Sequence, residues 1–303
     1  MRVLVVGASG ALGRPTIKAL LAHGIAVRGV CRHPEAAADL AAAGAEIVAG
    51  DLADRASIER ALAGTTRVLA AAHGLLGRGR WRSEAVDDAG HRDLIDAARA
   101  AGVERFVYTS ASMAAPDHPI DFARTKYSIE QALAQSALTY AILRPTAFME
   151  HHVHTFNGLN VLTKGKAQLV GPGTKRRNFV AASDVAHIAV RALLDEPLPF
   201  RRLDIGGPDH ATNIEVAALY ARAAGKALKV SHLPAAAARA MSVLVRPLHP
   251  GIARLMHLLS LPDDAFDETW RGAAELEARF GLRLTRLEDF VAARVREHAA
   301  AAG

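Results

Sequence analysis

Three glycines near the start of the chain have the spacing of a turn that binds a pyrophosphate. Gly7, Gly10 and Gly13 follow the apolar, β-branched run 3–6, which predicts a strand, and a helical pattern begins after them. In such a unit the first glycine permits the tight turn, the second lets phosphates approach the backbone, and the third lets the helix pack on the strand. The helix N-terminus then faces the anion. The residues expected at the phosphates are Gly7, Ser9, Gly10, Ala11, Leu12 and Gly13.

The end of the second expected strand, residues 25–30, bears on the choice of cofactor. A carboxylate about 20 residues beyond the glycines would bind a ribose 2′-hydroxyl and favour NAD. This chain has Arg32 there, with no acidic neighbour. Arg32, helped by Arg14, would pair with a 2′-phosphate, so NADP (NADPH) is favoured and NAD is the alternative. The competing interpretation of Arg32 is a solvated loop residue.

Residues that follow other expected strands complete the predicted cofactor site. Asp51 lies where an adenine would be met, and its alternative role is to cap the next helix, for which Asp54 is an equal candidate. The other residues predicted to contact the cofactor are Leu52, Ala72, His73, Lys126 and Pro145.

A cluster of histidines, His151, His152 and His154, follows the expected strand 138–143. There is no neighbouring cysteine and no i, i+4 histidine pair with a glutamate, so no metal site is predicted. The histidines are expected to line the pocket entrance or to be exposed. Any of them could donate a proton, and His152 is an arbitrary choice among them.

Strands and helices alternate along the chain in a way that indicates right-handed crossovers and a parallel sheet. We expect an α/β fold, a doubly wound Rossmann-like sheet with a smaller, mostly helical C-terminal substrate region. The first domain would span 1–146 and be completed by 179–206, and the second, 147–303, would comprise about 147–178 and 207–303. A helix is expected over 126–136, a closing helix over 285–298, and a frayed tail over 299–303.

Composition limits the classes of partner. The 303 residues carry a formal charge of +6, but the basic residues are dispersed, which argues against nucleic-acid binding. The only cysteine, Cys31, excludes an internal disulfide and is expected to be buried at a strand end. No signal peptide or membrane-spanning run is evident, so a cytoplasmic location is predicted. A monomer or a homodimer is expected, and the sequence does not decide between them.

The segment 241–261 is the most apolar part of the C-terminal half. Its prolines and cations indicate two short amphipathic helices. Three roles are open: a hydrophobic lid over substrate, a dimer surface, or a peripheral membrane contact. Lid or dimer surface is favoured because the cations are few.

Several motifs in order resemble those of the extended or atypical short-chain dehydrogenase/reductase superfamily, in its NmrA-like, isoflavone-reductase-like branch. The resemblance covers nearly the whole chain. The segments that carry it are 7–13, Gly50-Asp51-Leu52, 86–110, 143–150, 183–186 and 204–208.

The resemblance implies a serine and a Tyr-x-x-x-Lys pair that handle the proton. Ser110 and Lys126 match two of these positions, but Phe122 stands where the tyrosine should be. Lys126 could act alone as acid/base, could only bind the ribose, or could belong to a protein without turnover. The resemblance therefore implies an NADPH-dependent reductase of a small apolar carbonyl or enone-like substrate, with Lys126 and Ser110 nearest the chemistry. The alternative is a non-catalytic NADP(H)-binding sensor or assembly protein.

Overall fold

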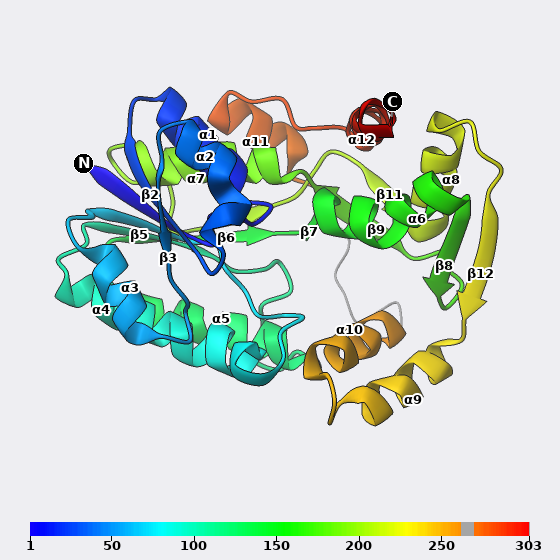
Figure 1. Cartoon of the computed structure of the whole chain (residues 1–303), viewed down its shortest axis with the longest axis horizontal. Helices are drawn as coiled ribbons and strands as arrows, with labels where there is room; N and C mark the ends of the chain where they lie inside the picture. Colours follow the sequence, from blue (N-terminus) through cyan, green and yellow to red (C-terminus); the bar gives the residue numbers. More distant parts are fainter. Residues whose placement is uncertain (262–269, 303) are drawn as a thin grey trace.

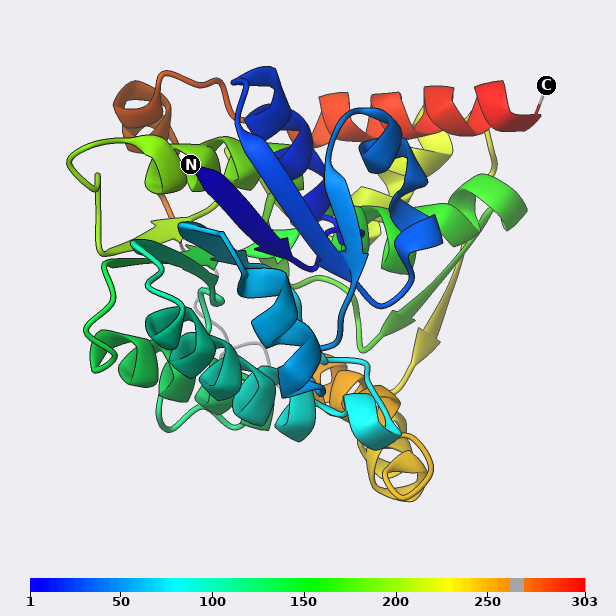
Figure 2. The same ribbon diagram turned by 60° about the vertical axis from the view of Figure 1, so that its left-hand side comes forward.

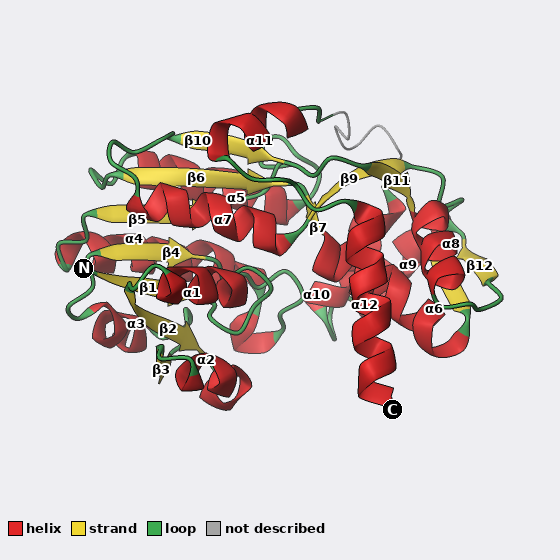
Figure 3. Ribbon diagram, turned by 90° about the horizontal axis from the view of Figure 1, so that it is seen from above, coloured by secondary structure: helices red, strands yellow, loops and turns green. Residues whose placement is uncertain are grey.

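A sheet of seven parallel strands forms the larger part of the molecule (Figure 1). The computed structural model describes residues 1–261 and 270–302. The strand order, β10-β6-β5-β4-β1-β2-β3, reverses direction beside β1 and confirms the predicted doubly wound fold (Figure 3). The strands are β1 (Arg2–Val6), β2 (Ala26–Cys31), β3 (Glu46–Ala49), β4 (Arg67–Ala70), β5 (Arg105–Thr109), β6 (Tyr140–Pro145) and β10 (Arg202–Ile205).

Helices cover both faces of this sheet because the central strands are buried on both sides. On one face lie α1 (Gly13–Ala22), α2 (Ala38–Ala42), α7 (Ala182–Leu194) and α11 (Ala273–Phe280). On the other lie α3 (Arg55–Leu62), α4 (Gly90–Ala100) and α5 (Asp121–Ala134). Short helical turns precede α2 and α4; they are η1 (Pro34–Ala37), η2 (Gly79–Trp81) and η3 (Glu84–Ala89).

Helix α5 begins earlier than the sequence pattern predicted. Its first residue is Asp121, and Lys126 lies inside the helix rather than at its start. The carboxylate of Asp121 in the first turn suits the positive end of the helix dipole, which explains the earlier start. Phe122 and Lys126 are therefore one turn apart on the same face of α5.

The smaller region contains two short sheets as well as helices (Figure 1). One sheet has the order β11-β9-β7, and the other pairs β12 with β8. Their strands are β7 (Ala147–Phe148), β8 (Lys166–Val170), β9 (Arg176–Val180), β11 (His210–Thr212) and β12 (Lys229–Leu233). The helices are η4 (Met149–Gly158), α6 (Leu159–Lys164), α8 (Asn213–Ala223), α9 (Ala235–Val245), α10 (Pro250–Ser260) and α12 (Leu287–Ala302).

Two details differ from the sequence-based expectations. The tail predicted to fray from residue 299 is helical, because α12 continues through Ala302; residue 303 lies outside the described residues. Within 179–206, α7 and β10 join the main layers, whereas residues 179–180 end β9 in the three-stranded sheet.

Cys31 is buried at the end of β2, as expected. Among the described residues, no helix is both long and apolar enough to cross a membrane.

Candidate functional site

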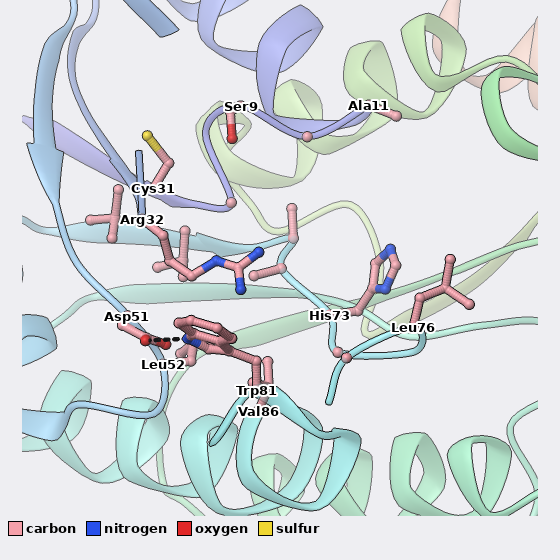
Figure 4. Close-up of a pocket in the computed structure, with 18 of the residues that line it drawn as sticks. Ser9, Ala11, Cys31, Arg32, Asp51, Leu52, His73, Leu76, Trp81 and Val86 are labelled. Atoms are coloured by element: carbon pink, nitrogen blue, oxygen red, sulfur yellow. Dashed lines mark hydrogen bonds between the residues drawn. The ribbon is translucent and has the colours of Figure 1, made fainter. Parts of the chain in front are cut away.

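A cavity of about 560 Å³ lies at the carboxyl ends of β1 to β4, where a doubly wound sheet binds its ligand (Figure 4). It collects segments that are far apart in the sequence. Predicted cofactor residues in its lining are Gly7, Ser9, Gly10, Ala11, Leu12, Arg32, Asp51, Leu52, Ala72 and His73. Four other predicted site residues, all described, lie outside the lining: Gly13, Ser110, Lys126 and Pro145.

The glycine turn has the close backbone contacts that its sequence predicted. Gly7 has φ +95° and donates its N–H to the carbonyl of Val30 at 3.0 Å. A Cβ on Gly13 would come within 2.2 Å of the Gly7 oxygen, and one on Gly10 within 3.2 Å of that atom. The first turn of α1, all of it described, contains no acidic side chain. This end of the cavity therefore fits a pyrophosphate at a helix N-terminus.

Asp51 faces the cavity rather than capping a helix. Asp54 is the N-cap of α3 and accepts a hydrogen bond from the N–H of Ser57 at 3.4 Å. Asp51 accepts from the N–H of Ala53 at 2.9 Å and from the indole Nε1 of Trp81 at 2.7 Å (Figure 4). Asp54 is therefore the residue that caps α3. Asp51 is left as a hydrogen-bond acceptor at this end of the cavity.

Arg32 lies over the face of the same indole. Its guanidinium carbon is 5.2 Å from the centre of the Trp81 ring, within the range of a cation–π contact (Figure 4). Arg14, expected to help Arg32 with a 2′-phosphate, is instead engaged elsewhere. Its guanidinium binds both carboxylate oxygens of Asp39, at 2.7 and 2.9 Å. Only Arg32 of the two lines the cavity.

Two histidines, His73 and His151, line the far end of the cavity, and Phe122 lies next to His73. The rings of His73 and His151 are 6.4 Å apart, and His73 is 6.3 Å from Phe122. Burial lowers the pKa of His73 to about 4 and also lowers the pKa of His151. Both imidazoles are consequently neutral near pH 7, and each can donate one N–H hydrogen bond.

Lys126 lies behind Phe122 and is only 3% exposed. Its Nζ donates to the carbonyl of Thr109 at 3.0 Å and is 5.4 Å from the centre of the Phe122 ring. Burial lowers the pKa of the Lys126 ammonium, and the carboxylates of Asp87 and Glu130 oppose that shift. The lysine is thus held next to the aromatic ring that occupies the tyrosine position.

Ser110 is part of a buried polar group beneath the site. Its hydroxyl donates to Glu130, which also accepts two hydrogen bonds from Arg144, at 2.8 and 2.5 Å. Pro145 ends β6, and its carbonyl accepts from the N–H of Ser112 at 2.9 Å. Ser110 and Pro145 therefore connect β5, β6 and α5 rather than lining the cavity.

The three neighbouring histidines lie in three different places. His151 lines the cavity, whereas His152 packs against Phe156 with ring centres 5.5 Å apart. His154 lies 3.1 Å from the hydroxyl of Tyr220. The histidine that reaches the site is His151, not the arbitrarily chosen His152.

Sequence reasoning missed several residues of the lining. The most important is Trp81, which comes from the glycine-rich loop between β4 and η3 and carried no periodic signal. The sequence signal that could have found it is a tryptophan within a loop rich in glycine and arginine. Other lining residues outside the predicted set include Leu76, Gly77, Arg78, Phe148 and His249.

The doubly wound sheet and the glycine turn at its switch point define a dinucleotide-binding α/β protein. Residues 7–196 match the model of a family described as NAD(P)H-binding, and the chain belongs to that family. This membership confirms the predicted class of cofactor, and it agrees with the resemblance to the atypical short-chain dehydrogenase/reductase class.

Known proteins with this similarity include reductases and an assembly factor. The chain is 26% identical over 228 residues to the NAD(P)H azoreductase of Xenophilus azovorans, covering 75% of each protein. It is 29% identical over 246 residues to the Photosystem II assembly factor Ycf39 of a Synechocystis species, covering 81% of this chain and 74% of that protein. The NADPH complex of the Escherichia coli quinone oxidoreductase QOR2 superposes with a TM-score of 0.72 at 25% identity, covering 95% of this chain and 98% of that one.

Proposed function

We propose that this protein is an NADPH-dependent reductase of small, apolar, electron-poor acceptors such as conjugated carbonyls and enones. The observation that carries the proposal is the cavity itself. It joins the glycine turn, Arg32 and two neutral histidines along one edge of the sheet. The similarity to an azoreductase and to a quinone oxidoreductase supports the same class of reaction.

The cofactor would be held by residues already in the lining. The turn from Gly7 to Leu12 would bind the pyrophosphate, and the guanidinium of Arg32 would pair with the 2′-phosphate that distinguishes NADPH from NADH. Asp51 would accept from the adenine amino group once Trp81 has left its carboxylate. Bound NADPH would supply a hydride to the acceptor.

The side chains around the acceptor end support an electron-poor substrate. Phe122 has no proton to give, and neutral imidazoles are weak acids near pH 7. His73 and His151 would instead donate hydrogen bonds that polarise the acceptor. An acceptor whose reduced form is a stabilised anion takes its proton from water, so no strong acid in the protein is required.

In this proposal Lys126 and Ser110 position the site. Lys126 would fix the end of β5 through the Thr109 carbonyl and would keep the ring of Phe122 in place. Ser110 would hold β5 to α5 through Glu130. Monomeric or homodimeric assembly and a cytoplasmic location stay predictions, as does the division into a cofactor domain and a substrate region.

A second candidate is a non-catalytic NADP(H)-binding sensor or assembly protein. Phe122 in place of the acid and the similarity to an assembly factor favour it. Such a protein would bind NADPH through the same cavity but would not oxidise it with any acceptor.

Calorimetric titration with NADPH and NADH, followed by an acceptor panel, separates the candidates. We expect NADPH to bind more tightly than NADH and to be oxidised by quinone, azo or enone acceptors. Tight binding without oxidation by any acceptor would favour the sensor. Absence of binding by either nucleotide at micromolar concentration would overturn both candidates.

A further inference from the structure

Helices α9 and α10 form a hairpin that projects from the body of the molecule (Figure 2). The end of α9 and the connection to α10 carry the most exposed large apolar side chains of the described chain. Val243 and Leu244 of α9 are 69% and 75% exposed, and Leu248 of the connection is 80% exposed. Met241 of α9 and Ile252 of α10 are also exposed, at 41% each. We call these five residues the hairpin tip; such a concentration of exposed apolar side chains marks an interaction surface.

The charged side chains of the hairpin itself are all basic, although Glu84 and Asp121 of the body line the groove beside it. No aspartate or glutamate occurs in the sequence between Glu215 and Asp263, so neither helix carries an acidic side chain. Arg239 and Arg246 are exposed on α9 and at its end, next to the hairpin tip. An apolar surface beside cations and without acids has the composition of an interfacial membrane anchor.

The opposite side of the hairpin is fixed to the body by a third arginine. Arg254 of α10 binds both carboxylate oxygens of Asp121, at 2.7 and 3.0 Å, and its side chain is only 5% exposed. It also donates to the carbonyl of Leu75 at 3.1 Å. Arg254 is therefore used in docking the hairpin, whereas Arg239 and Arg246 stay exposed along the groove that Arg254 and Asp121 also line.

From this arrangement we propose that the hairpin tip binds the surface of an anionic lipid bilayer. Val243, Leu244 and Leu248 would enter the interface, and Arg239 and Arg246 would pair with lipid phosphates. A second copy of the chain is the competing occupant, and the test below distinguishes it by oligomeric state.

The hairpin also forms part of the cofactor cavity. His249, which precedes α10, lines that cavity, and Gly251 packs against the backbone of Leu76 in the opposite wall. The lipid-binding surface is thus the outer side of an element whose inner end reaches the site. The proposal does not depend on the reductase function, because it concerns the outer side alone.

Vesicle flotation of the full-length chain tests the proposal. We expect binding to vesicles of equal parts phosphatidylcholine and phosphatidylglycerol, weaker binding to phosphatidylcholine alone, and a loss of binding as salt is raised. The double variant Leu244→Glu with Leu248→Glu should bind the anionic vesicles at least about tenfold more weakly. Arg246→Glu should reduce the preference for anionic lipid about tenfold.

Matched controls show whether the effect belongs to the hairpin tip. Leu159→Glu replaces an apolar residue that is 42% exposed on α6 and should leave vesicle binding unchanged. The hairpin-tip variants should keep the NADPH affinity of the parent chain, which shows that they fold. Equal binding by the parent and the double variant would overturn the proposal. So would a dimer, measured by light scattering, that the double variant abolishes while neither chain binds vesicles.

Discussion

The indole Nε1 of Trp81 donates a 2.7 Å hydrogen bond to the carboxylate of Asp51, at the end of the cavity where an adenine would be met. Arg32 covers the same indole. If an adenine amino group is to reach the side of the carboxylate that Trp81 occupies, the indole must move, so we expect the indole and the cofactor to compete for that position.

Removing the indole should therefore strengthen cofactor binding. A hydrogen bond to a charged group contributes about 1.5–3 kcal/mol, so we expect Trp81→Ala to bind NADPH about tenfold more tightly. Trp81→Phe, which keeps a ring but loses the donor, should behave similarly. Calorimetry measures both, and the fluorescence of Trp81 in a Trp270→Phe background reports its departure. Weaker binding by both variants would instead mean that the ring contacts the cofactor.

The two arginines near the glycine turn should respond differently to removal. Arg32→Ala should weaken NADPH binding about tenfold to a hundredfold and leave NADH binding nearly unchanged, because only NADPH carries the 2′-phosphate. Arg14→Ala is the control, since Arg14 is already paired with Asp39. Equal losses for both nucleotides in Arg32→Ala would refute the assigned role.

Substitutions at Gly13 and Gly10 should separate an effect on folding from an effect on cofactor binding. Gly13→Ala places a Cβ within 2.2 Å of the Gly7 oxygen and should lower the free energy of unfolding by roughly 3 kcal/mol. Gly10→Ala meets the same oxygen at 3.2 Å, so its cost should be about 1 kcal/mol. Its main effect should be weaker NADPH binding, because the added methyl faces the phosphates. Thermal unfolding and calorimetry together distinguish the two; a folded Gly13→Ala that binds normally would contradict the model of the turn.

Replacing Phe122 with tyrosine restores the missing acid one helical turn before Lys126. We expect Phe122→Tyr to raise turnover of unactivated carbonyl acceptors about a hundredfold and to leave electron-poor acceptors little changed. Phe122→Leu, which lacks the hydroxyl, is the matched control. An equal gain with both acceptor classes would show that proton supply is not what limits the parent protein.

Stability should fall in mild acid because His91 is buried in its neutral form. Burial lowers its pKa from 6.5 to about 4. Between these pH values the unfolded chain binds the proton and the folded chain does not, so the free energy of unfolding decreases as the pH falls. His91 contributes at most about 3 kcal/mol to this loss. Chemical denaturation at several pH values should show a shallower slope for His91→Gln, and an unchanged slope would argue against a neutral buried imidazole.

The main sheet was predictable from sequence because its strands are short apolar runs with helical patterns between them. The glycine turn was predictable for the same local reason. Trp81 was not, because its side chain reaches Asp51 from a loop, and loop conformation follows from tertiary contacts rather than from periodicity. The start of α5 was missed because Phe122 and Ala123 were not counted with the apolar face of that helix. Asp121, an acidic residue in a first turn, was the overlooked signal.

The sequence did not indicate how deeply the predicted site residues are buried. The four-residue spacing predicted Lys126 and Phe122 on one helix face, and the structure has them in contact. The spacing could not show that Phe122 also lies near His73 or that Ser110 bonds to Glu130. Those contacts depend on how α5 packs on β5 and β6. These three elements come from separate segments of the chain.

The position of α7 and α11 on one face of the main sheet has a consequence for synthesis. The strands next to the glycine turn are complete once residue 70 has been made, but the helices that cover them extend to Phe280. A nascent chain leaving the ribosome therefore has α1 and α2 on this face early, but the part of the face over β4 to β6 stays exposed until α7 is complete at Leu194. A fragment ending at residue 146 would keep that part uncovered, and chaperone dependence should fall sharply only once α7 has been released.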